Sequence, residues 1–92
     1  MQATAEFQLI PLGTGVSVRR EIERVIALLQ ARPLLLETHA SGTNIEGDLR
    51  QILDAVEAVH DTLHAEGVVR LVSYLKLETR TDKPPTLEGK RL

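Results

Sequence analysis

A short polar segment, TNIEGD at residues 43–48, surrounds one isoleucine with hydroxyl, amide and carboxylate groups. In a strand, Asn44 and Glu46 share one face, while Ile45 lies on the other. Asparagine offers two donors and an acceptor, and ionised glutamate offers only acceptors. Together these groups can bind the amino and ring-nitrogen edge of a heterocycle. The same residues are also typical of a solvated edge strand whose charges oppose aggregation, so both interpretations stay open.

The loop LGTGVS at residues 12–17 is a second candidate. Thr14 and Ser17 could present hydroxyls, with backbone N–H groups, at a helix N-terminus that holds an anion or a hydrogen-bonding ligand. The loop lacks the third glycine of a dinucleotide fingerprint and the Gly-Lys-Ser/Thr of a P-loop. The alternative is a simple turn in which Ser17 caps the following helix.

The three histidines do not define a metal or catalytic site. His60 and His64 are four residues apart, but no third ligand follows and His-Glu-x-x-His is absent. A Ser17/His39/Glu46 triad is conceivable, yet no nucleophile elbow or oxyanion signature supports it. We therefore expect no catalytic residue and no metal site.

Composition excludes several functions. The net charge of −2 leaves no basic excess for a phosphate backbone, and two aromatic residues are too few for base stacking. Without cysteine there is no disulfide or zinc–thiolate site. The N-terminus does not have the pattern of a signal peptide, and no apolar run approaches the ~20 residues that span a bilayer. We expect a cytoplasmic protein with no nucleic-acid or membrane partner.

Period-two alternation predicts strands over residues 3–12 and 68–78. Two shorter strands are predicted over residues 34–40 and 43–47, with a turn at Ser41-Gly42 between them.

Two stripes with helical spacing lie between these strands. Pro33 ends the first helix, and the second begins at the N-cap Asp48 and ends near Gly67. The stripes comprise Val18, Ile22, Val25, Ile26 and Leu29 in the first helix, and Leu49, Ile52, Leu53, Val56, Val59 and Leu63 in the second.

The element order predicts an α+β, ferredoxin-like βαββαβ domain over residues 1–79, a four-stranded antiparallel sheet with two helices on one face. The helix-free face is expected to carry Ile10, Val72 and Tyr74, diluted by charged residues. It is either an oligomer interface, which a domain this small favours, or an ordinary wet sheet face.

Residues 80–92 form a polar tail with two prolines and no periodicity. This tail is either a solvated terminus or an arm laid on a neighbouring subunit. In the second case Arg80 and Lys83 would contact that subunit or an anionic ligand.

Three stretches resemble the small thiamine-binding proteins of the MTH1187/YkoF-like superfamily, which includes the uncharacterised UPF0045-type family. They are IPLGTGVSV, TNIEGD and LKLETRTDKPPTLEGK, and the resemblance covers essentially the whole chain. Its most specific parts are Thr43 with Ile45-Glu46-Gly47, and residues 80–83 followed by Glu88-Gly89-Lys90.

The resemblance implies a ferredoxin-like subunit of a homodimer or homotetramer. It implies binding of thiamine or its hydroxymethylpyrimidine part, with no catalysis and no cofactor. Family members often have a hydrophobic or small residue where this chain has Asn44. Carried over by position, the ligand-binding residues are Thr43, Asn44, Glu46, Thr14, Ser17, Arg80 and Lys83.

Two other functions are compatible with the same fold. An acylphosphatase-like phosphohydrolase needs an arginine inside a glycine-rich phosphate loop, but Arg19 and Arg20 come after LGTGVS. A structural or regulatory module would instead bind another protein on the open sheet face.

Overall fold

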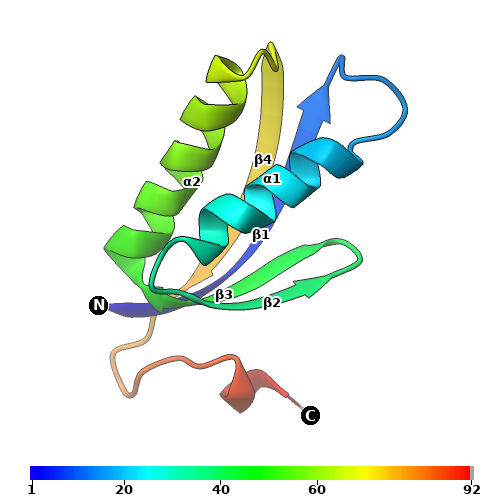
Figure 1. The fold of residues 1–92 in the computed structure, drawn as a ribbon. Helices are drawn as coiled ribbons and strands as arrows, with labels where there is room; N and C mark the ends of the chain where they lie inside the picture. Colours follow the sequence, from blue (N-terminus) through cyan, green and yellow to red (C-terminus); the bar gives the residue numbers. More distant parts are fainter. Residues whose placement is uncertain (92) are drawn as a thin grey trace.

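The computed structural model describes residues 1–91, which form a sheet with both helices on one face (Figure 1). The strand order is β2-β3-β1-β4, and each neighbouring pair is antiparallel. The predicted α+β ferredoxin-like fold is therefore confirmed. Among the described residues, no helix is long and apolar enough to span a membrane. The elements are β1 (Gln2–Leu12), α1 (Arg19–Gln30), β2 (Leu35–His39), β3 (Gly42–Asp48), α2 (Leu49–Ala65), β4 (Arg70–Glu78) and the short helical turn η1 (Glu88–Lys90).

The core lies between the helices and one face of the sheet. Alternation along the central strand β1 turns its odd-numbered residues towards the helices, so its even-numbered residues face away. The same parity places Ile45 of β3 in the core and turns Asn44 and Glu46 outwards. Buried core residues include Ala3, Ala5, Phe7, Leu9, Val25, Leu29, Ile45, Ile52, Ala55, Val59 and Leu63.

Strand register arranges the helix-free face, called here the open face, into polar and apolar parts. The apolar part lies towards the C-terminal end of β1, where Gln8 pairs with Tyr74 and Ile10 pairs with Val72. The open face is thus half apolar and half charged, as its alternation predicts. The polar part consists of two rows across the strands, Leu35–Glu46–Thr4–Glu78 and Glu37–Asn44–Glu6–Lys76.

The ends of the helices confirm one predicted cap and correct another. Asp48 accepts hydrogen bonds from the backbone N–H groups of Arg50 and Gln51, at 3.1 and 3.4 Å, and so caps α2. Ser17 does not cap α1. Val18 occupies the N-cap position, and its carbonyl accepts the first helical hydrogen bond, from Ile22.

The hairpin between β2 and β3 turns at Ala40 and Ser41, so that Gly42 becomes the first residue of β3. A Cβ atom at Gly42 would lie 2.6 Å from the carbonyl oxygen of Phe7. Glycine is therefore required for β3 to begin this close to β1.

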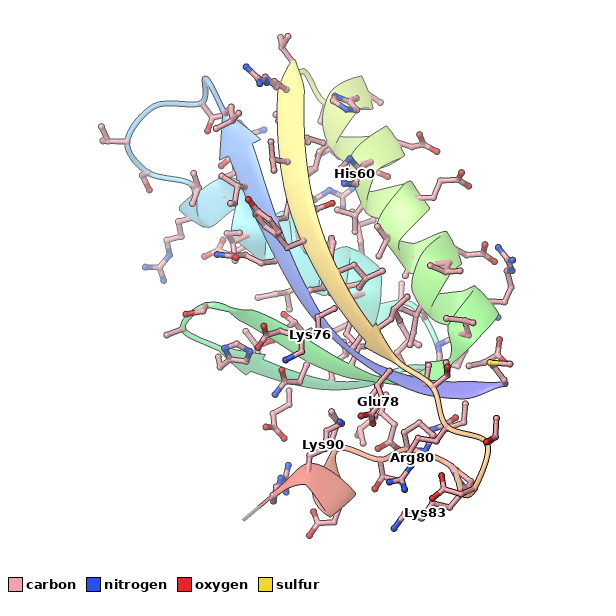
Figure 2. The ribbon with its side chains drawn as sticks, turned by 180° about the vertical axis from the view of Figure 1, so that it is seen from behind. His60, Lys76, Glu78, Arg80, Lys83 and Lys90 are labelled. Carbon is pink, nitrogen blue, oxygen red and sulfur yellow. The ribbon has the colours of Figure 1, made fainter. Side chains whose placement is uncertain are left out.

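The C-terminal tail folds back onto its own sheet. Residues 84–91, called here the strap, reach the open face at the end where β1 begins (Figure 2). Pro85 and Leu87 are buried, and Thr4 beneath the strap is only 2% exposed. The two predicted alternatives, a solvated terminus and an arm on a neighbour, are both corrected for the strap. The polar composition of the tail gave no indication that Pro85 and Leu87 would be buried.

Candidate ligand-binding site

A pocket of about 260 Å³ lies on the open face, between the polar rows of the sheet and the strap. This volume is slightly below the about 300–1,000 Å³ of typical small-molecule sites, so the pocket suits part of a small ligand, such as a single heterocycle. Carboxylate, amide and ammonium groups line it from all four strands, and the strap supplies the remaining wall. The lining residues are Thr4, Ala5, Glu6, Glu37, Asn44, Lys76, Leu87, Lys90 and Arg91.

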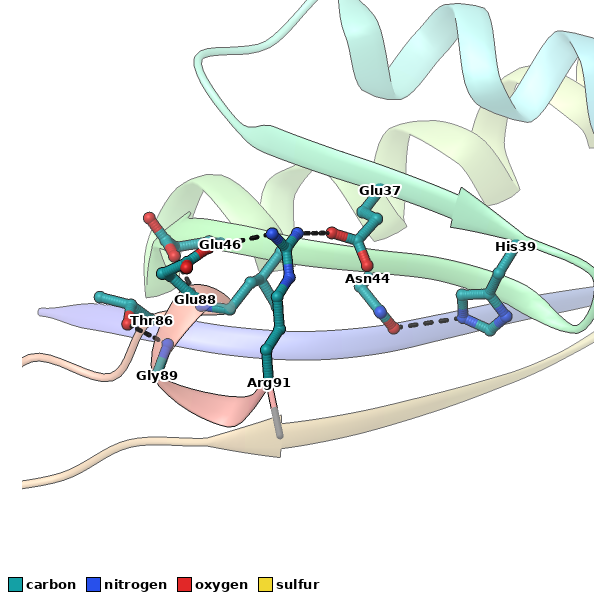
Figure 3. A network of polar contacts seen from close by, with 9 residues as sticks. Glu37, His39, Asn44, Glu46, Thr86, Glu88, Gly89 and Arg91 are labelled. Atoms are coloured by element: carbon teal, nitrogen blue, oxygen red, sulfur yellow. Dashed lines mark hydrogen bonds and ion pairs between the residues drawn. The ribbon is translucent and has the colours of Figure 1, made fainter.

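Asn44 is oriented by a neighbouring histidine (Figure 3). The backbone N–H of Ser41 donates to Nδ1 of His39 at 3.2 Å, so the neutral ring carries its proton on Nε2. Nε2 then donates to Oδ1 of Asn44, also at 3.2 Å. This leaves the NH₂ group of Asn44 as a donor beside the carboxylates of Glu6 and Glu37.

Glu46 lies on the open face, as its position in β3 predicts, but its carboxylate is engaged by the strap. Oε1 accepts the backbone N–H of Leu87 at 2.7 Å. Glu46 is therefore next to the pocket rather than in its lining. Its role in the structure is to anchor the strap.

Two ion pairs join the strap to the sheet around the pocket. The Lys90 ammonium lies 2.8 Å from Oε1 of Glu78, and it lowers the pKa of that carboxyl below its ordinary value of 4.5. Arg91 pairs with Glu37 of β2, which raises the pKa of the guanidinium (Figure 3). Arg91 also contacts Glu88, at 2.9 Å.

Three of the predicted site residues lie away from this pocket. Thr43 points to the helix side of β3, where it is 5% exposed and its hydroxyl lies 3.4 Å from that of Thr38. Thr14 and Ser17 follow the far end of β1, whereas Glu46 pairs with Thr4 near the start of the strand. At a rise of about 3.3 Å per residue, the stretch from Thr4 to the end of β1 spans about 26 Å.

Arg80 and Lys83 lie in the turn between β4 and the strap, and Figure 2 shows both below the sheet. The guanidinium of Arg80 donates to Asp82 at 2.9 Å, and this pairing raises the pKa of Arg80. Both basic residues line a separate hollow with Met1 and Gln2. Of the seven predicted residues, only Asn44 lines the pocket and only Glu46 borders it.

The remaining lining residues were not predicted as ligands. Glu6, Glu37 and Lys76 could have been found from strand parity, because they share a row with Asn44 once the strand order is known. Lys90 belongs to the Glu88-Gly89-Lys90 part of the resemblance, but neither Lys90 nor Arg91 could be placed at the pocket, since the tail has no periodicity.

Other polar groups are engaged elsewhere. His60 shares a hydrogen bond with Ser73 at 2.8 Å, and His64 bonds to the Val68 carbonyl at 2.7 Å. Within residues 1–91 no three side chains are grouped to hold a metal ion. A second hollow of about 280 Å³, more apolar, lies under the start of α1 and includes Pro11 and Ser41.

Fold and site together define a small ferredoxin-like protein with a charged pocket on its open sheet face. Residues 5–91 match the family of thiamine-binding proteins, and the chain belongs to this family. The resemblance inferred from the three motifs is thereby confirmed.

Relatives from distant organisms share most of the chain. UPF0045 protein sll0230 from Synechocystis is 39% identical over 98% of this chain and 74% of its own length. UPF0045 protein MJ1052 from Methanocaldococcus jannaschii is 42% identical over 97% of this chain and 88% of its own.

Solved structures show the same fold. The crystal structure of MJ1052 superposes with a TM-score of 0.90, covering 97% of this chain and 91% of that one. A Thermotoga maritima protein, provisionally assigned to thiamine biosynthesis or salvage, is 22% identical with a TM-score of 0.87. Its match covers 98% of this chain and 95% of that one, and at this identity it supports the fold alone.

Proposed function

We propose that this protein binds thiamine, or the hydroxymethylpyrimidine part of thiamine, in the pocket on its open face and does not transform it. The observation that carries this proposal is the row Glu37–Asn44–Glu6, which lines the half-open pocket. Membership of a thiamine-binding family supports the same ligand.

The chemistry of the row matches the two ends of thiamine. A carboxylate can accept hydrogen bonds from the amino group of the pyrimidine, while the NH₂ group of Asn44 can donate to a ring nitrogen. The second carboxylate can offset the positive charge of the thiazolium. A hydrogen bond to a charged group contributes about 1.5–3 kcal/mol, so two such contacts support roughly micromolar affinity after entropic costs.

Changing Glu6 to glutamine tests the assignment of the pocket. The carboxylate of Glu6 is half exposed, and its Oε2 lies 3.5 Å from Nε2 of the neutral His39 ring, so it is available to a ligand. We expect Glu6→Gln to weaken thiamine binding about tenfold in calorimetry, the effect of one lost charge-assisted hydrogen bond.

Glu57→Gln, on the exposed side of α2, is the matched control because it removes the same charge outside the pocket. Equal losses of affinity in the two variants would contradict this site and point to a general effect of net charge.

We also propose that the protein is a homodimer or homotetramer that associates through the apolar part of the open face. Tyr74 is 63% exposed there, next to the pair formed by Ile10 and Val72. The mass of the purified chain, measured by light scattering, tests this assembly.

A further inference from the structure

The strap combines a buried anchor with a cationic end. Leu87 is 8% exposed, and its backbone N–H donates to Glu46, so this part is held by both apolar burial and a hydrogen bond. Beyond it, η1 is a single short turn, in which the N–H of Gly89 donates to the hydroxyl of Thr86 at 2.9 Å. The hydrogen-bond geometry of such 3₁₀ turns is poorer than that of an α-helix, so η1 holds this end of the strap less firmly.

Lys90 and Arg91 follow the anchor, and both line the pocket. Each is about half exposed, and each pairs with a half-exposed carboxylate, Glu78 or Glu37 respectively. Exposed ion pairs are weak and are screened by salt. The cationic end can therefore leave the pocket while Leu87 keeps its place.

The charge of the pocket depends on where this end lies. Glu6, Glu37 and Lys76 are its charged groups on the sheet, and Glu78 adjoins them in the neighbouring row. Without Lys90 and Arg91, these groups carry an excess of negative charge. With the strap in place, the two cations neutralise that excess and occupy carboxylates that a cationic ligand would need.

We propose that Lys90 and Arg91 form an internal competitor for cationic ligands, which must displace the end of the strap to bind. This inference rests on the proposed function and adds a means of regulating the same pocket. It also gives a selectivity rule: the strap opposes a cation such as thiamine more than it opposes the neutral hydroxymethylpyrimidine.

The double variant Lys90→Gln/Arg91→Gln tests the competition by calorimetry. Because the competing charges are removed and the anchor remains, we expect thiamine to bind about three- to tenfold more tightly, with a smaller gain for hydroxymethylpyrimidine. Arg19→Gln/Arg20→Gln is the matched control, since it makes the same change in net charge on α1 and should leave both affinities unchanged.

A companion measurement uses the wild-type chain. Adding thiamine should shift the backbone amide resonances of Lys90 and Arg91 towards those of a free chain and leave that of Leu87 in place. Unchanged or weaker thiamine binding by the double variant would overturn the competition and leave the proposed function standing. Equal gains for both ligands, or for the α1 control, would overturn the charge argument. Failure of both the wild type and the variant to bind thiamine would overturn the proposed function, and this inference with it.

Discussion

Replacing Asn44 with leucine is expected to weaken thiamine binding about 100-fold, which corresponds to about 2.7 kcal/mol. Asn44 stands in the middle of the row between Glu37 and Glu6, and His39 orients its amide. Leucine removes the donor for the ligand, removes the hydrogen bond with Nε2 of His39, and fills part of the pocket. Lost hydrogen bonds to the ligand's polar groups, which the leucine leaves unpaired in the pocket, have about this effect.

Gln8→Leu provides the control for this substitution. Gln8 is exposed on the same face of β1, one row beyond the pocket. Its replacement therefore introduces a leucine side chain on the open face but outside the pocket. Calorimetry should show an affinity close to that of the wild type for Gln8→Leu. A thiamine affinity retained by a folded Asn44→Leu variant would remove Asn44 from the site.

Replacing Phe7 with alanine is expected to lower the free energy of unfolding by about 3–5 kcal/mol. Phe7 is 2% exposed and is among the largest fully buried side chains, on the strand at the centre of the sheet. Alanine leaves a cavity beneath the helices, and the loss is a large part of the about 5–15 kcal/mol that stabilises a typical domain.

Urea unfolding of Phe7→Ala and Gln8→Ala measures this difference. Gln8 is adjacent in sequence but exposed on the opposite face, so its replacement should change the free energy of unfolding by less than about 0.5 kcal/mol. Similar losses in the two variants would contradict the assignment of the core face of β1.

The local sequence pattern was sufficient to predict the fold and to predict which face of each strand is buried. Alternation in β1 and β3 has one solution that buries Phe7 and Ile45, and that solution turns Asn44 and Glu46 outwards. The cap at Asp48 also depends only on neighbouring residues, and it was predicted correctly.

The composition of the site depends on contacts that no local pattern encodes. Leu87 reaches Glu46 across 41 positions, and Arg91 reaches Glu37 across 54. The resemblance grouped Thr14 and Ser17 with Asn44, although Asn44 pairs with Glu6 and the rest of β1, to Leu12, lies between them. The parity of β3 excluded Thr43 from the open face, and that argument was available from the sequence.

The most direct test of the central claim is an NMR titration of the labelled chain with thiamine. We expect saturable shifts centred on the backbone amides of Glu6, Glu37, Asn44 and Lys76. Shifts confined to the hollow around Pro11 and Ser41, or no saturable shift at any residue, would contradict it.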